Sequence, residues 1–180
     1  MIPIRRGPRP PVTKSDYETV RRLGLRRLIG FPVLMVMASR ITGLPLHYAA
    51  ACLEKETGGR NVYGHDPTFP RLQGKRVTWR NYTRVYLPAR KASGNRVMQG
   101  VGPLQLTWWA TQDTADREGG CWVPWVNMIV GYRTLWASIR THGPEMGAAI
   151  YNGGPSPGAA ARRYGADFMV KAAKWQALGL

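Results

Sequence analysis

Acidic residues are scarce in this sequence. Its 180 residues include 10 Asp and Glu against 26 Lys and Arg, which gives a formal net charge of +16 and a pI near 10.8. No acid occurs between Asp66 and Asp113, and the basic residues concentrate in two blocks, 5–27 and 71–96. The positive electrostatic field of such a chain attracts polyanions, whether nucleic acid, anionic lipid headgroups or an acidic cell-wall polymer. Charge alone does not choose among these partners.

Cysteine is almost absent as well. Cys52 and Cys121 lie far apart and lack the spacing of a metal site, which excludes a disulfide framework and a cysteine-based metal centre. We expect no metal and no cofactor. A single disulfide between the two stays open, but so sparse a count does not indicate one. We predict two buried, small hydrophobic side chains in a protein made at a reducing site.

The sequence also lacks a long hydrophobic run. The apolar stretch 28–38 has 11 residues, whereas a helix needs about 20 to span a bilayer, so we expect no membrane span. It follows Arg26 and Arg27 and so imitates a signal peptide or a short anchor. Because it begins well inside the chain and contains Pro32, a buried first helix over 32–41 is the favoured interpretation.

The length and hydrophobic content of the chain suit one folded domain. Hydrophobic residues make up 44% of the chain and seven residues are Trp, which is enough to build a core. The first 15 residues carry four prolines without apolar periodicity, which indicates an extended basic tail. A capping box of Ser15 and Glu18 predicts a short helix over 16–27. We therefore divide the chain into a basic tail with a short helix, residues 1–30, and a folded domain, residues 31–180.

Apolar periodicity predicts an α+β protein that is mostly α-helical. Apolar residues recur at spacings of three and four, and proline or glycine marks the ends of these segments. This pattern predicts helices over 45–56, 125–142, 145–152 and 164–178. Residues 77–86 are rich in β-branched and aromatic side chains, and they predict one strand or a short hairpin. This would be the small β element of the fold.

Glu56 lies in the last turn of the helix predicted over 45–56, just before Gly58 and Gly59. A carboxylate at a helix C-terminus faces the negative end of the helix dipole, and partial burial disfavours its charged form, so both effects raise its pKa. A general acid needs a raised pKa. Glu54 lies on the other flank of the apolar stripe and is the weaker candidate.

Two glycine-marked turns follow Glu56 along the chain. Gly100–Pro103 leads to Gln105, whose amide can both donate and accept hydrogen bonds, and Tyr151 with Asn152 precedes a glycine pair. Taken alone, each feature is as consistent with structural capping. Together, their order and chemistry predict a sugar-cleaving cleft, in which an acid protonates the leaving oxygen and polar groups bind the substrate.

Three segments of the chain carry a resemblance to a known family. ITGLPLHYAAACLEKETGGRNV (41–62), GVGPLQLT (100–107) and AAIYNGG (148–154) resemble the motifs of lytic transglycosylases and goose-type lysozymes. PWVNMI (124–129) is similar to the start of that family's helix between these motifs, where an Asn begins a long apolar run. The similarity covers residues 31–178 and rests on the order and spacing of the motifs.

This resemblance implies a lysozyme-like fold and a set of site residues. The catalytic acid would be Glu56, and the substrate-binding residues would be Thr57, Gln105, Tyr151 and Asn152, with Tyr151 near the acid. Two positions depart from the pattern: Thr57 stands where Ser is usual, and Leu104 stands where Met commonly precedes the Gln.

The activity implied is cleavage of the β-1,4 bond between N-acetylmuramic acid and N-acetylglucosamine in peptidoglycan. A strongly basic enzyme of this kind without a clear signal suggests a phage endolysin or its catalytic domain, and a secreted bacterial enzyme stays open. We expect a monomer that is made in the host cytoplasm and acts on the bacterial cell wall after release. Its charge would hold it on anionic wall polymers.

Two alternatives stay open. Inverting hydrolysis needs a second carboxylate about 6.5–9.5 Å away, for which Asp66 is the nearest candidate unless it caps a turn, whereas in transglycosylation the sugar's own 6-hydroxyl attacks and Glu56 alone suffices. Separately, the basic blocks with Trp79, Tyr82 and Tyr86 would suit a nucleic-acid-binding protein. That function would leave the Glu, Gln and Tyr-Asn motifs unexplained, so we expect no specific nucleic-acid partner.

Overall fold

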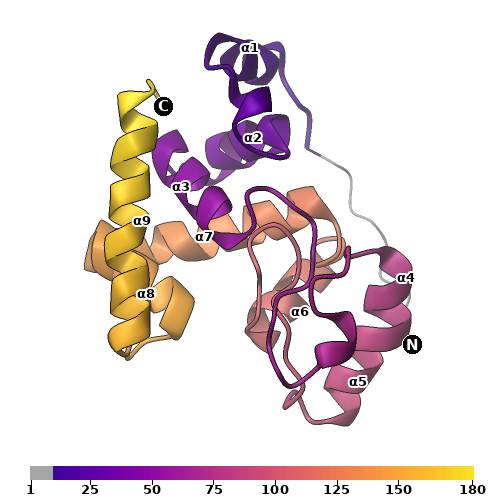
Figure 1. The fold of residues 1–180 in the computed structure, drawn as a ribbon. Helices are drawn as coiled ribbons and strands as arrows, with labels where there is room; N and C mark the ends of the chain where they lie inside the picture. Colours follow the sequence, from indigo (N-terminus) through magenta and orange to yellow (C-terminus); the bar gives the residue numbers. More distant parts are fainter. Residues whose placement is uncertain (1–9) are drawn as a thin grey trace.

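The computed structural model of this chain describes residues 10–180, which are mostly helical (Figure 1). The helices are α1 (Lys14–Arg22), η1 (Leu25–Arg27), α2 (Pro32–Thr42), α3 (Leu46–Glu56), η2 (Pro70–Leu72), α4 (Trp79–Asn81), η3 (Tyr82–Tyr86), α5 (Leu87–Ala92), α6 (Trp109–Arg117), α7 (Pro124–His142), α8 (Pro144–Gly153) and α9 (Ala159–Ala177). The predicted class, mostly α-helical, is confirmed.

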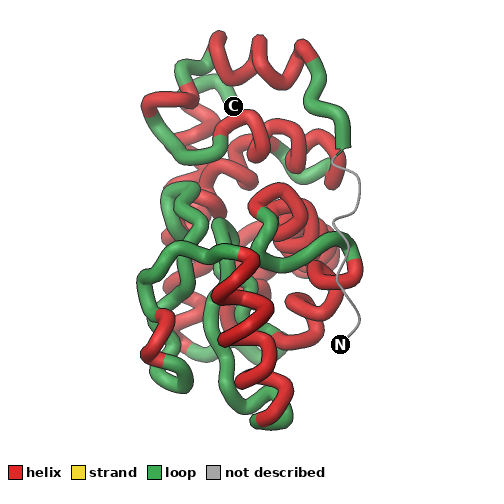
Figure 2. The backbone as a smooth tube through the Cα atoms, turned by 90° about the vertical axis from the view of Figure 1, so that its right-hand side faces the viewer, coloured by secondary structure: helices red, strands yellow, loops and turns green. Residues whose placement is uncertain are grey.

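The long helix α7 runs through the middle of the fold. It packs against α2 on one side and against α8, and α9 packs against both α8 and α3. In Figure 1 these helices form the upper and left parts of the molecule, and α4, α5 and α6 lie on the right with several loops. Figure 2 shows that the loops gather in this lower part. The molecule therefore has a helical side and a loop-rich side, joined by α7.

The predicted buried helix over residues 32–41 is confirmed as α2. Pro32 occupies its first turn and Gly43, in the left-handed region with φ 73°, ends it. The apolar stretch is divided between two environments, since Met35–Ala38 lie in the core while Leu28 is exposed. Within residues 10–180, no helix is long and apolar enough to cross a membrane.

The first helix begins earlier than predicted and is shorter. Its N-cap is Thr13, whose hydroxyl accepts from the Asp16 backbone N–H (3.2 Å) while the Asp16 carboxylate accepts from the Thr13 N–H (2.8 Å). The predicted box of Ser15 and Glu18 is therefore wrong. Asp16 is favoured because its buried carboxylate also binds Arg40 of α2 at 3.0 Å, which ties the two helices together.

The predicted strand over residues 77–86 is wrong, because this segment is helical. Thr78 and Asn81 form a capping box that starts α4, and Tyr82 and Tyr86 lie one turn apart on a fully buried face. The middle of the segment is a π-helical turn, η3. The Leu87 N–H donates to the Tyr82 carbonyl and closes this turn, and Pro88 follows in the first turn of α5.

The β structure of the described residues is limited to isolated bridges. They join Val62 to Arg76, Tyr63 to Val101, and Val101 to Leu106, all antiparallel. These bridges hold together the loops that follow α3 and surround the glycine-rich turn. The predicted small β element is thus present only as single bridges, at a different place from the one predicted.

One hydrophobic core includes residues from both predicted parts of the chain. Val20, Leu25 and Ile29 belong to the same buried cluster as the residues of α2, α3 and α7. Both cysteines are free and buried, as predicted. Residues 1–9 of the predicted tail lie outside the described residues, and the chain from residue 10 to 13 is not helical.

The end of α3 is held by a close backbone contact with the segment before α2. Gly30 donates its N–H to the Gly58 carbonyl (3.0 Å), and Gly58 and Gly59 both have positive φ, at 63° and 83°. A Cβ on Gly30 would lie 2.5 Å from the Gly59 carbonyl oxygen, so only glycine allows this approach. The two glycines that end the predicted helix therefore also fix its position.

This contact predicts unequal effects of two neighbouring substitutions. Gly59→Ala should lower the free energy of unfolding by roughly 3 kcal/mol or more, because the new Cβ is strained by positive φ and also overlaps the Gly30 carbonyl. Gly58→Ala meets only open space and should cost about 1–2 kcal/mol from backbone strain alone. Chemical denaturation of both variants measures the difference. Equal losses would contradict the packing account.

Candidate active site

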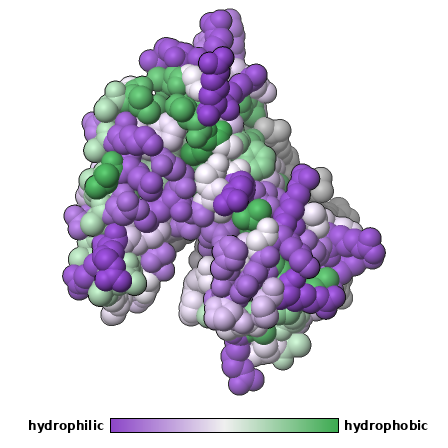
Figure 3. Space-filling view, viewed as in Figure 1, coloured by the Kyte–Doolittle hydropathy of each residue, from purple (hydrophilic) through white to green (hydrophobic). Residues whose placement is uncertain are grey.

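Four of the five predicted site residues line one cavity. Glu56 comes from the end of α3, Gln105 from the glycine-rich turn, and Tyr151 and Asn152 from the end of α8. The cavity has a volume of about 690 Å³. Figure 3 shows it as a cleft that separates the helical side from the loop-rich side. The other lining residues are Met98, Leu106, Thr107, Trp108, Thr111, Thr134, Ser138, Ile150, Gly153, Gly154 and Pro155.

Glu56 is the last residue of α3 and is partly buried in the wall of the cavity. Burial raises the pKa of Glu56 to about 7, against the weaker opposing effects of a hydrogen bond from Tyr164 and the positive charge of Lys55. The predicted direction of this pKa shift is confirmed. At neutral pH a large share of the Glu56 carboxyl groups therefore carries a proton.

Tyr164 of α9 is the residue that contacts the acid directly. Its hydroxyl donates to Glu56 Oε1 at 2.5 Å, and the Lys55 ammonium lies 4.4 Å from the centre of its ring. Tyr151, predicted to be the tyrosine near the acid, lines the same cavity as Glu56, and its hydroxyl donates to the Leu104 carbonyl at 3.0 Å. Sequence analysis placed Tyr164 only at the start of a helix. Its spacing of four from the buried Phe168 was the available signal that it faces inward.

Glu54 forms hydrogen bonds with a different set of partners. Its carboxylate accepts from Lys171 Nζ (3.1 Å) and from Trp175 Nε1 (2.7 Å), both on α9. Burial opposes its charge, but these hydrogen bonds prevail and hold the pKa of Glu54 below its ordinary value. The two carboxyl groups of α3 thus have opposite properties, and Glu54 does not line the cavity described above.

The glycine-rich turn is held by one buried side chain of α7. Asn127 Oδ1 accepts from the Leu104 N–H (2.9 Å), and its Nδ2 donates to the Val101 carbonyl (2.8 Å). Gly102, at φ 78°, lies against this amide, where a Cβ would be 2.6 Å from the Asn127 nitrogen. The Asn that starts the apolar helix in the quoted motif therefore sets the shape of the turn.

Gln105 lines the cavity, yet its amide group is used within the turn. Nε2 donates to the carbonyls of Val62 (2.9 Å) and Gly102 (2.8 Å), and the residue itself has a positive φ of 48°. Both amide hydrogens are therefore engaged by the protein. A contact between this amide and substrate stays a prediction, and its observed role is to hold the turn at the cavity wall.

Thr57 and Asp66 are not among the residues described as lining the cavity. The buried Thr57 hydroxyl donates to the Pro103 carbonyl (2.8 Å), so it fastens the end of α3 to the glycine-rich turn. Its predicted contact with substrate stays a prediction. Asp66 Oδ1 accepts from both the backbone N–H (2.9 Å) and the hydroxyl (2.7 Å) of Thr68, which is the capping role considered as its alternative.

Sequence reasoning missed the aromatic and hydroxyl side chains of the opposite wall. Trp108 lines the cavity with 59% of its surface exposed, and Thr111 follows one turn later on α6. Thr134 and Ser138 of α7 add hydroxyl groups between the two sides. Adjacent tryptophans in a polar segment, Trp108 and Trp109, were a visible signal because such large side chains are usually buried.

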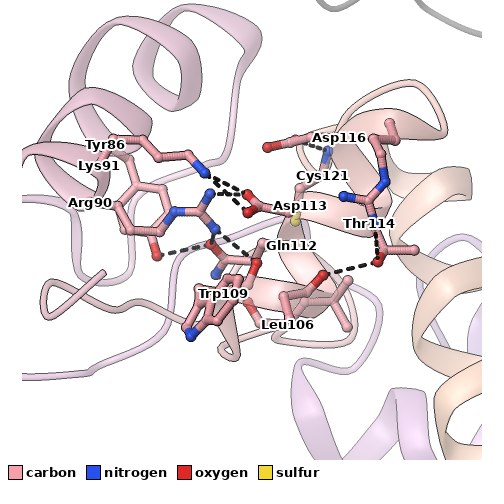
Figure 4. Close-up of polar contacts among 12 residues, drawn as sticks. Tyr86, Arg90, Lys91, Leu106, Trp109, Gln112, Asp113, Thr114, Asp116 and Cys121 are labelled. Atoms are coloured by element: carbon pink, nitrogen blue, oxygen red, sulfur yellow. Dashed lines mark hydrogen bonds and ion pairs between the residues drawn. The ribbon is translucent and has the colours of Figure 1, made fainter. Parts of the chain in front are cut away.

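A buried polar network supports that wall from behind (Figure 4). Arg90 of α5 is fully buried, and it donates to Gln112 Oε1 (2.8 Å) and to the Trp109 carbonyl (3.2 Å). Gln112 in turn donates to the Leu106 carbonyl (2.7 Å), and Asp113 pairs with Arg90. The network therefore joins α5, α6 and the segment before Trp108. It fixes the start of α6, where the exposed tryptophan lies.

Of the three aromatic residues considered for stacking, Tyr82 and Tyr86 are fully buried. Trp79 is exposed, and the Arg84 guanidinium lies 5.3 Å from the centre of its ring. Within the part of the chain that the structure describes, no group of three His, Cys, Asp or Glu side chains could hold a metal ion. Protein-family models, curated proteins and solved structures were compared with this chain, and none matches it.

The raised pKa of Glu56 predicts a pH-dependent stability effect. A folded-state pKa of about 7, above the ordinary 4.5, means that stability falls as pH rises through this interval. Glu56→Gln keeps the bond from Tyr164 but cannot ionise. It should raise the free energy of unfolding by up to about 3 kcal/mol at pH 8, and by nothing below pH ~4. Thermal unfolding across this pH range measures the effect.

Glu54→Gln is the matched control, with the opposite sign. Because the pKa of Glu54 is lowered by its partners, its charge stabilises the fold above its ordinary pKa, and this contribution disappears as pH falls through the folded-state value. The substitution should therefore lower stability by about 1 kcal/mol at pH 7 and have less effect in acid. If Glu56→Gln also lowered stability at pH 8, its carboxyl group would not be a strained buried acid.

Proposed function

We propose that this chain is a peptidoglycan glycosidase with Glu56 as its general acid and base. The observation that carries the proposal is a carboxyl group whose pKa is raised to about 7 inside a cleft lined by polar and aromatic side chains. A carboxyl group that is protonated near neutral pH can give its proton to a glycosidic oxygen. The motif resemblance then selects peptidoglycan among the polysaccharides.

The hydrogen bond from Tyr164 gives Glu56 a defined orientation for this step. Tyr164 occupies Oε1, so the proton of the neutral carboxyl group resides on Oε2 and is free for transfer. As the proton moves to the leaving oxygen and the C1–O bond breaks, Glu56 becomes a carboxylate. Tyr164 and Lys55 then both stabilise the new charge, since both favour the ionised form.

The opposite wall suits a sugar chain. Trp108 offers an exposed aromatic face for a pyranose ring, and Thr111 on the same wall and Asn152 at the end of α8 offer groups for hydroxyl and acetamido substituents. The Arg90 network holds this wall, and the hydrogen bond from Tyr164 holds the acid on the other side of the cleft. Such a preformed cleft suits an extended polymer better than a small ligand.

The carboxyl groups around the cleft favour the transglycosylase form of the reaction. Glu56 is the only acidic residue among the described lining residues, and Asp66 is engaged as a cap. Without a second carboxylate to activate water, the muramoyl 6-hydroxyl can attack C1 and return its proton to Glu56. The product is then a 1,6-anhydromuramoyl end. Inverting hydrolysis would need a base from outside this set.

The charge of the chain fits a lytic enzyme that works on the bacterial wall. A net charge of +16 would retain it on anionic wall polymers by an attraction that salt weakens. We propose a monomeric phage endolysin or its catalytic domain, made in the host cytoplasm and acting on the wall after release. A lysozyme-like arrangement of the helices around the cleft belongs to the same proposal.

The first functional prediction concerns the acid and its products. Glu56→Gln should reduce clearance of a cell-wall suspension at least about 100-fold, the loss expected when a general acid is removed. Glu54→Gln, assayed where it is fully folded, should keep activity within a few-fold. Mass spectrometry of the digested wall should show anhydromuramoyl ends. Reducing ends would establish hydrolysis instead, and full activity of Glu56→Gln would refute the assignment.

The second functional prediction separates the enzyme from a nucleic-acid-binding protein. Exposed arginines around Trp79 could bind any polyanion, so binding to DNA should fall steeply between low and moderate salt. The double change Arg80→Gln and Arg84→Gln should weaken retention on the wall and its salt dependence, yet spare cleavage of short soluble wall fragments. Tight DNA binding at moderate salt, with no wall fragment bound or cut, would favour the nucleic-acid function.

A further inference from the structure

The short helix η1 and the turn that leads from it to α2 present apolar and basic side chains to solvent. Leu25 and Ile29 anchor this turn in the core, with 0% and 6% exposure. Between them, Arg26, Arg27 and Leu28 are all exposed, and Leu28 has 53% of its surface free. The two buried residues therefore fix which side chains of the turn face outward.

Phe31 completes this surface in an unusual conformation. It is the N-cap of α2 with φ 52°, a left-handed value that bulky residues rarely adopt, and 37% of its surface is exposed. Glycine or asparagine would fit this backbone better, so a phenylalanine at this position carries a backbone cost.

Among the described residues, the charges around this turn have no ion-pair partners. No ion pair of the described residues involves Arg26 or Arg27, nor Arg21 or Arg22 at the end of α1. The nearest acids in the chain are engaged, because Asp16 binds Arg40 and Glu18 lies 3.7 Å from Lys14.

We propose that the surface formed by Arg26, Arg27, Leu28 and Phe31 docks on an anionic lipid bilayer. Arginines beside the membrane are attracted to negatively charged headgroups, and an exposed leucine and phenylalanine can enter the boundary between headgroups and acyl chains. A polyanion without an apolar phase would use the arginines but leave Leu28 and Phe31 in water. The combination therefore favours lipid over nucleic acid or a wall polymer.

This surface is separate from the cleft, and the proposal does not rest on glycosidase activity. None of its four residues is among those that line the cavity around Glu56. Glu56→Gln should therefore bind vesicles like the parent protein. The second basic surface, around Arg80 and Arg84, has an exposed tryptophan but belongs to the loop-rich side, which gives an internal comparison for charge.

The experiment is sedimentation of the full chain with vesicles of phosphatidylglycerol and phosphatidylcholine, and with pure phosphatidylcholine. Binding should require the anionic lipid. Arg26→Gln with Arg27→Gln should lower the partition coefficient on the order of tenfold, since each arginine near the surface contributes about fivefold. Arg80→Gln with Arg84→Gln should lower it clearly less. Equal losses from the two pairs would show long-range attraction only and overturn the proposal.

The apolar part is tested by Leu28→Ser and Phe31→Gly, with Val170→Ser as the control. Val170 on α9 is 69% exposed, so it matches their chemistry and accessibility away from the arginines. Leu28→Ser and Phe31→Gly should each lower partition several-fold and leave DNA binding unchanged, and Val170→Ser should alter neither. Glycine accepts φ 52°, and thermal unfolding of Phe31→Gly checks that the variant is folded at the temperature of the assay. Partition unchanged by both variants would overturn the proposal.

Discussion

The removal of water from one carboxyl group is the constraint around which this structure is organised. Glu56 ends a helix, where the dipole already disfavours its charge, and burial raises its pKa to about 7. That state exists only because α9 covers the end of α3, with Tyr164 against the carboxyl group and Phe168 in the core one turn further. A less complete cover would return Glu56 to an ordinary, ionised surface residue.

The same constraint explains why the pKa values of Glu54 and Glu56, both on α3, shift in opposite directions. The two acids are two residues apart, so they lie on different flanks of one helix and meet different parts of α9. Glu54 receives an ammonium group and an indole N–H, and stays charged. Glu56 receives a single hydroxyl group, and burial raises its pKa so that a large share of it is neutral at pH 7. Environment rather than residue type thus determines which carboxyl group can act as an acid.

Local sequence signals predicted most of the long helices and four of the residues that line the cleft. Proline at helix starts and glycine at helix ends placed α2, α3 and α7 closely, because these residues act on their own backbone. The error over residues 77–86 came from ranking β propensity above the capping pair Thr78–Asn81 and the spacing of the buried Tyr82 and Tyr86. Propensity is the weaker guide where side chains are buried by distant elements.

The parts of the site that sequence reasoning missed are those made by contacts far along the chain. Tyr164 reaches Glu56 across more than a hundred residues, and Arg90 supports the wall that carries Trp108 through Gln112. Neither has a motif of its own, since its role exists only once the helices have packed. The same holds for Thr57 and Gln105, where the motif predicted ligand contacts and the structure shows hydrogen bonds within the protein.

The glycine contact beneath the end of α3 has a mechanical consequence. Gly30 touches Gly58 and Gly59 backbone to backbone, so no flexible side chain lies between them to absorb a displacement. Gly30 is also the neighbour of Phe31 in the turn that faces solvent, and Gly58 is two residues from Glu56. A displacement of that turn by a bound surface would therefore be transmitted by backbone contact to the end of α3, where Glu56 lies.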